Sequence, residues 1–152
     1  MTKRRQKSDL TSDEALLLDN QVCFPLYSAA NAVSRAYRPI LDQLELTYSQ
    51  YLVMMVLWEQ DGASVKEVGA RLYLDSGTLT PLLKRLESKG FVARSRSEED
   101  ERVRVLNLTA EGRRLQKVAN SVPSAMKCKI DLSIDELMSL KHLCEKVVKK
   151  LA

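Results

Sequence analysis

Apolar residues recur three and four positions apart along most of the chain, which is the spacing of amphipathic helices. One such stripe runs through residues 25–44. Residues 48–59 are apolar on nearly every side, so we expect a helix buried at the centre of the fold. Two shorter helices are expected next, one over residues 65–72 and one that begins near Ser76 and ends at Gly90, a residue suited to a helix C-terminus.

The hydrophobic pattern then changes to that of strands. Residues 91–96 and 103–108 predict two strands, and the charged loop between them predicts a hairpin. Thr109 is placed to cap a further helix, which Pro123 interrupts, and a last amphipathic helix is expected over residues 134–151. The chain is therefore predicted to be mainly α-helical with a small β-hairpin.

Local signals mark where several helices begin. A serine or threonine followed three residues later by Glu or Gln can exchange hydrogen bonds with the backbone of the first turn. Four such capping boxes precede periodic apolar runs: Thr11–Glu14, Thr47–Gln50, Ser64–Glu67 and Ser133–Glu136. Pro25 suits a first turn and disfavours helical backbone at Phe24, so it predicts the start of the first long helix.

The charge of the chain is unevenly distributed. The 152 residues carry 24 basic and 20 acidic side chains, a net charge of +4. Most of this excess lies in residues 1–10, which we expect to be a disordered basic arm. Residues 64–96 hold seven basic and three acidic residues, a second local excess of +4. Positive charge is thus concentrated over the two short helices and the first strand.

Several classes of protein are excluded at this point. The longest apolar run, residues 52–58, is too short to cross a bilayer, and no secretion signal is recognisable, so a cytoplasmic location without membrane contact is expected. Three cysteines, an odd number, do not suggest a disulfide scaffold.

Two short helices followed by a hairpin is the order of elements in a winged helix-turn-helix, whose second helix enters the major groove of double-stranded DNA. Hydroxyl, lysine and arginine side chains on that helix and on the wing can contact phosphates and base edges. The expected DNA contacts are Ser76, Gly77, Thr78, Thr80, Lys84, Arg85, Arg94, Arg96, Asp100, Arg102 and Arg104. The alternative is that these charges form ordinary solvated faces.

The first and last helices carry wide apolar stripes that a winged module does not need. We expect residues 11–152 to form a single domain, with residues 46–109 as the winged module and residues 11–45 and 110–152 as dimerisation helices. A homodimer would match a palindromic operator. The alternative is that these helices pack back on their own module.

At this point the residues resemble a known family. The sequence of residues 100–102 in the wing, followed by that of residues 106–112, resembles the MarR family of repressors. Residues 18–27, 46–53 and 74–85 resemble its OhrR branch, the organic hydroperoxide sensors. The resemblance covers residues 16–150 and implies a single MarR-type domain.

The three cysteines lie in different predicted positions relative to the helices. Cys23 is expected just before a helix, where unpaired N–H groups favour the reactive thiolate, although a lone cysteine is more often a core residue. The resemblance implies that Cys23 is the peroxide-sensing cysteine and that Tyr27, Tyr37 and Tyr48 hydrogen-bond its sulfur across a dimer interface.

The resemblance also implies a two-cysteine type of sensor, in which Cys128 of the partner subunit resolves the oxidised Cys23 as an intersubunit disulfide. Alternatively, Cys128 is an incidental exposed cysteine. Cys144 is interpreted as a packing residue. A metal site at His142, Cys144 and Cys128 is not expected, because residues two apart on a helix face different directions.

The predicted function is a redox-sensing transcriptional repressor that binds DNA when reduced and releases it when organic hydroperoxide oxidises it, with no cofactor and no enzyme activity. Two alternatives remain open: a MarR-type regulator controlled by a reversible small-molecule ligand, and a thiol peroxidase.

Overall fold

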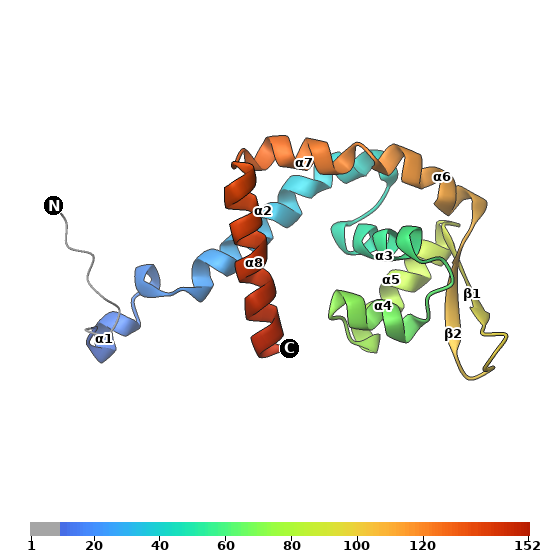
Figure 1. The fold of residues 1–152 in the computed structure, drawn as a ribbon, viewed down its shortest axis with the longest axis horizontal. Coiled ribbons are helices and arrows are strands. Elements are labelled where there is room, and N and C mark those ends of the chain that lie inside the picture. The colour runs from blue at the N-terminus through green and yellow to red at the C-terminus, as the bar shows by residue number, and fades with distance from the viewer. Residues whose placement is uncertain (1–9) are drawn as a thin grey trace. The chain divides into compact units, whose positions relative to one another are not determined.

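The computed structural model describes residues 10–152, which fall into two compact units, one ending at Ala36 and one covering residues 37–152. The expected basic arm therefore lies outside the described residues, apart from Leu10. In the first unit, helix α1 (Ser12–Ala15) and the 3₁₀ helix η2 (Leu18–Asn20) precede α2 (Cys23–Leu41), which continues into the second unit. Figure 1 labels the main elements along the chain.

The second unit contains the winged module. After the end of α2 it consists of η3 (Asp42–Leu44), α3 (Tyr48–Glu59), α4 (Val65–Leu72), α5 (Ser76–Ser88), β1 (Val92–Arg96), β2 (Arg104–Leu108), α6 (Ala110–Ala119), α7 (Val122–Ile130) and α8 (Ile134–Leu151). The prediction of a mainly helical chain with one hairpin is confirmed. All four predicted capping boxes are present, each with both of its hydrogen bonds.

The core of this unit is built around α3. Its Val53, Met54 and Leu57 are fully buried, as expected for a helix that is apolar on all sides. Helix α5 packs against it with the apolar stripe that contains Leu79, Leu83 and Leu86, while α4 and β2 also contact α3. The buried stripe of α5 leaves the opposite face of this helix exposed.

The two strands form the antiparallel hairpin that was predicted. Their register pairs Val92 with Leu108 at one end and Arg96 with Arg104 at the other. The turn before α4 adds to the sheet, because Leu106 donates its N–H to the carbonyl of Ala63 at 2.9 Å. This bond anchors the base of the hairpin, which we call the wing (residues 92–108), to the helices.

The first long helix departs from its predicted bounds. It begins at Cys23 rather than at Pro25, and it ends at Leu41, where a 3₁₀ turn replaces the last predicted residues. Pro25 is thus the third residue of the helix. It is tolerated there because the first four N–H groups of a helix have no intrahelical partner.

The strands also begin one residue later than predicted, at Val92 and Arg104. Phe91 and Val103 instead donate their N–H groups to the carbonyls of Leu86 and Asp100, which closes the turns on either side.

Candidate nucleic-acid interface and redox site

Helix α5 presents a polar face to solvent. Its N-cap, Asp75, accepts the N–H of Thr78 at 2.7 Å, which fixes the first turn. The predicted contact residues of this helix are exposed, apart from the half-buried Thr80: Ser76, Gly77, Thr78, Lys84 and Arg85. This surface offers hydroxyls at one end and two cations further along.

The wing supplies the other predicted cations. Arg96, Arg102 and Arg104 are exposed and form no salt bridge with any described residue. Arg94 differs, because its guanidinium lies 2.8 Å from the carboxylate of Glu87 on α5. Asp100 accepts the N–H of Arg102 at 3.0 Å and thereby shapes the tip of the wing. Arg94 and Asp100 thus stabilise the fold of the wing through these interactions, in addition to any contact that they make with DNA.

Lys89, the C-cap residue of α5, makes contacts that the sequence pattern did not predict. Its ammonium donates to the carbonyl of Glu45 and, at 3.1 Å, to the side-chain oxygen of Gln50. Gln50 is buried and also caps the start of α3. Lys89 therefore ties the end of α5 to the residues around Tyr48. No periodicity could have revealed this, because the partners are 39 and 44 positions away.

The predicted redox residues fall in both units. Cys23, the first residue of α2, and Tyr27 lie in the first unit and are exposed. Cys128, on α7, is exposed and lies in the second unit with Tyr37 and Tyr48. Cys144, on α8, is half-buried. None of the three cysteines forms a disulfide within the described chain.

Tyr37 and Tyr48 form an aromatic cluster in the second unit. Their rings stack with centroids 4.5 Å apart, and the ring of Tyr51 lies 6.0 Å from that of Tyr37. Burial, helped by the neighbouring tyrosines, raises the pKa of Tyr37 to about 12, and burial also raises the pKa of Tyr48. Both phenols therefore keep their protons at neutral pH and can donate hydrogen bonds.

Two further observations concern other classes of site. Within residues 10–152, no group of three His, Cys, Asp or Glu side chains is arranged to hold a metal ion. No helix in the same range is long and apolar enough to span a bilayer.

Comparisons with known proteins agree with this architecture. A family model described as transcriptional regulator SarA/Rot matches residues 35–118. The HTH-type transcriptional regulator TtmR of Methylorubrum extorquens is 51% identical over 128 residues, which are 84% of this chain and 66% of that protein. The chain thus spans just under two thirds of the length of this relative.

The organic hydroperoxide resistance transcriptional regulator of Bacillus subtilis is 45% identical over 124 residues, or 82% of this chain and 84% of the relative. A solved structure of reduced AbfR, a Staphylococcus epidermidis protein, bound to DNA superimposes with a TM-score of 0.74 at 36% identity. It covers 92% of this chain and 97% of AbfR. The winged module and these relatives together show that the chain belongs to the MarR family of winged helix-turn-helix transcriptional regulators, in the branch that includes the organic hydroperoxide resistance regulator.

Proposed function

We propose that this transcriptional regulator is a homodimeric repressor that binds a palindromic operator when reduced and leaves it when an organic hydroperoxide oxidises Cys23. The observation that carries the proposal is an exposed, free cysteine at the first position of α2 in a chain 45% identical to an organic hydroperoxide resistance regulator. No cofactor is needed, because the cysteine itself is the redox centre.

The exposed face of α5 and the wing support operator binding. Lys84, Arg85 and Arg96 carry charges that no described carboxylate neutralises, so they are available to DNA phosphates. Ser76, Gly77, Thr78 and Thr80 would lie at the end of α5 that approaches the base edges in a winged helix-turn-helix complex. Arg94, Asp100, Arg102 and Arg104 would flank them from the wing. The reduced AbfR bound to DNA is a precedent for this mode of binding.

The proposed chemistry starts at the Cys23 sulfur. The thiolate attacks the O–O bond of the hydroperoxide, whose alkyl-bearing oxygen leaves as an alcohol, and the sulfur becomes a sulfenic acid. The thiol of Cys128 of the partner subunit then attacks this sulfur, expels water and forms an intersubunit disulfide. Two electrons pass from the two thiols to one hydroperoxide. AbfR has also been solved in a disulfide form, which supports the second step.

The protonated phenols of the tyrosines would assist the reaction of the Cys23 thiolate with the hydroperoxide. Because Tyr37 and Tyr48 remain protonated well above neutral pH, they can donate hydrogen bonds to an anionic sulfur. Tyr27, exposed in the first unit, is the third proposed donor.

Exposed apolar side chains support a dimer. Helix α8 has no buried residue, yet it carries Ile134, Met138, Leu143 and Leu151, each more than half exposed. The first unit likewise exposes most of its apolar side chains, Leu16 and Val22 among them. Apolar surface of this extent marks an interaction site.

The test is an operator-binding assay on a DNA fragment from upstream of the regulator's own gene, before and after cumene hydroperoxide and again after dithiothreitol. The parent protein should lose binding and then recover it. Cys23→Ser should bind DNA and ignore the oxidant. A Cys23→Ser variant that responds like the parent would overturn the proposal.

The role of Cys128 is tested separately on a non-reducing gel. Cys128→Ser should form sulfenic acid, detected with dimedone, but no disulfide-linked dimer, whereas the matched control Cys144→Ser should behave like the parent. A dimer band that persists in Cys128→Ser would rule out this resolving role. Sustained turnover of hydroperoxide with added thiol would instead favour a thiol peroxidase.

A further inference from the structure

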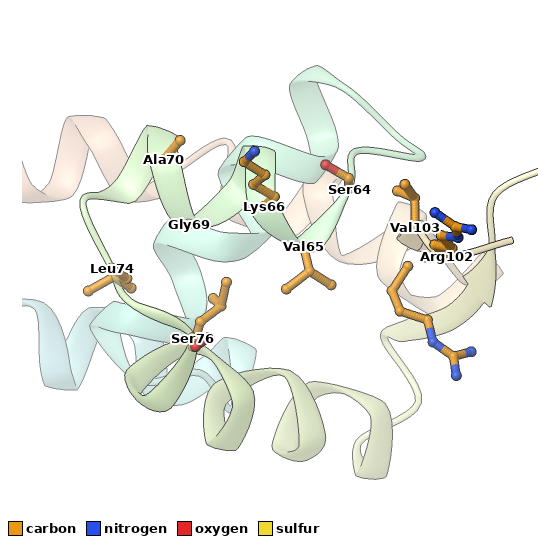
Figure 2. A pocket seen from close by; sticks show the side chains of 11 residues that line it. Ser64, Val65, Lys66, Gly69, Ala70, Leu74, Ser76, Arg102 and Val103 are labelled. Atoms are coloured by element: carbon orange, nitrogen blue, oxygen red, sulfur yellow. The ribbon is translucent and has the colours of Figure 1, made fainter. Parts of the chain in front are cut away.

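The outer part of the wing does not pack on the helices of the winged module. A cavity of about 560 Å³ lies between α4, the first turns of α5 and the wing. Figure 2 shows Val65 of α4 and Ser76 of α5 on its two sides, with Arg102 and Val103 of the wing beyond them. The direction of the outer wing therefore depends on contacts that lie closer to its base.

The turn between α3 and α4 covers the edge of β2 that does not pair with β1. Leu106 donates its N–H to the carbonyl of Ala63 and accepts the N–H of Gly62, both at 2.9 Å. Asp61 adds one more bond to this edge, because its carboxylate accepts the N–H of Leu108 at 2.8 Å. A side-chain oxygen thus takes the place of a backbone carbonyl at the base of the wing.

The second oxygen of the Asp61 carboxylate is bound to another element. It accepts a hydrogen bond from the guanidinium of Arg113, near the start of α6, and forms an ion pair with it. The side chain of Asp61 is 29% exposed, so water screens its charge only in part. Because both of its oxygens are engaged, the carboxylate is fixed in orientation and joins β2 to α6.

We propose that Asp61 is a positioning residue for operator binding. By holding Leu108 and Arg113 together, it fixes the direction of the wing relative to α6. This direction decides where Arg102 and Arg104 meet the DNA backbone. The inference rests on the operator contacts proposed above for the wing, and it adds a residue that acts on DNA only through them.

The sign of the effect separates positioning from simple electrostatics. DNA is a polyanion, so the removal of a nearby negative charge should by itself strengthen binding. The loss of an anchor of the wing should weaken binding instead. We expect Asp61→Ala to lower operator affinity about tenfold, which is roughly the value of one charge-assisted hydrogen bond.

Fluorescence anisotropy on the full-length reduced protein measures this affinity, at low salt so that weak binding remains measurable. Glu111→Ala is the matched control, because it removes an acidic side chain whose ion-pair partner, Arg114, lies on α6 itself. This control should bind the operator at least as tightly as the parent. Asp61→Asn keeps an acceptor for Leu108 but loses the charge, so its affinity should lie between those of Asp61→Ala and the parent. An Asp61→Ala variant that binds as tightly as the parent would overturn the proposal.

A second background distinguishes positioning of the wing from a general loss of structure. A variant with both Arg102→Gln and Arg104→Gln has a wing without these charges, so it contacts DNA mainly through α5. Asp61→Ala should lower operator affinity little further in this background, because its effect passes through the two arginines. If Asp61→Ala lowered the affinity equally in both backgrounds, the positioning role would be wrong.

The anchor itself is measured in the free protein. In Asp61→Ala, the amide hydrogen of Leu108 should exchange with solvent faster, as NMR would show, because it has lost its acceptor. The amide of Asn107, which pairs with Ala93 inside the hairpin, is the control within the same molecule. An unchanged exchange rate at Leu108 would contradict the anchor. If the parent bound no operator, the proposed function would fail, while this exchange rate would still decide whether Asp61 holds the wing.

Discussion

At the scale of single residues, the half-buried phenol of Tyr37 makes the stability of the fold depend on pH. Its pKa of about 12 in the folded chain exceeds the ordinary value of 10.0, mainly because burial removes water from the charged form. As the pH rises above 10, the unfolded chain therefore loses this proton first. The free energy of unfolding is unaffected below that pH and falls as the pH rises toward 12.

Tyr37→Phe removes this titration. We expect the stability of the variant to fall less steeply between pH 10 and 12 than that of the parent, as measured by urea unfolding across that range. Tyr73→Phe is the matched control, because Tyr73 is 70% exposed. Parallel pH profiles for Tyr37→Phe and the parent would show that the phenolate of Tyr37 is not disfavoured in the fold.

Gly112 is a residue that has no room for a side chain. It is buried in the first turn of α6, and a Cβ there would overlap the backbone carbonyl of Phe91. Its own carbonyl accepts the indole N–H of Trp58 at 2.9 Å, so a shift of this turn also disturbs α3.

Gly112→Ala should destabilise the fold by about 3 kcal/mol, because backbone rather than a flexible side chain must move. Thermal or urea unfolding measures the loss. Gly77→Ala, in the exposed first turn of α5, should change stability by less than about 1 kcal/mol. Equal effects of the two substitutions would contradict the assigned contact.

At the scale of elements, α5 has one apolar face that is buried and one polar face that is exposed. One face supplies Leu79, Leu83 and Leu86 to the core, and the other exposes Lys84 and Arg85. Its C-terminal end is held by Lys89 against Glu45 and Gln50. The orientation of the exposed face is therefore set by contacts on the opposite side and at the end of the helix.

Arg85→Gln should weaken operator binding and reduce the slope of log affinity against log salt by about 1, because one phosphate contact is lost. Lys117→Gln, an exposed lysine on α6, is the control and should leave both values unchanged. Fluorescence anisotropy at several salt concentrations measures the slope. A slope unaffected by Arg85→Gln would remove this residue from the phosphate contacts.

At the scale of the whole molecule, the proposed dimer depends on apolar residues that the single chain leaves exposed. Helix α8 has apolar side chains at Leu140, Leu143 and Val147, spaced as one stripe, and none of them is buried. Covering such a stripe with that of a second copy would stabilise both copies through the hydrophobic effect.

Leu143→Glu should place a charge in the proposed dimer interface and shift the protein toward monomers, as analytical ultracentrifugation would show. Lys146→Glu, on the same helix but outside the apolar stripe, should leave the dimer intact. Because a palindromic operator requires two recognition helices, the Leu143→Glu variant should also lose most of its operator affinity. A stable Leu143→Glu dimer would exclude α8 from the interface.

The sequence determined the elements of this protein and their order. Capping boxes lie at Thr11, Thr47, Ser64 and Ser133, α3 is a continuous apolar run, and α4 and α8 show helical periodicity. These signals depend only on residues within a few turns of one another, so they can be recognised in the sequence alone. The start of α2 was placed two residues late, because a proline is tolerated at the third helical position as well as at the first.

Only the tertiary structure decided which of the candidate residues meet. The stacking of Tyr37 on Tyr48, the bond from Lys89 to Gln50 and the cavity between α4, α5 and the wing all join residues separated along the chain. Such contacts arise from the packing of elements against one another, and no local pattern encodes them. The sequence therefore supplied the chemistry, and the packing selected which charges, phenols and apolar side chains act together.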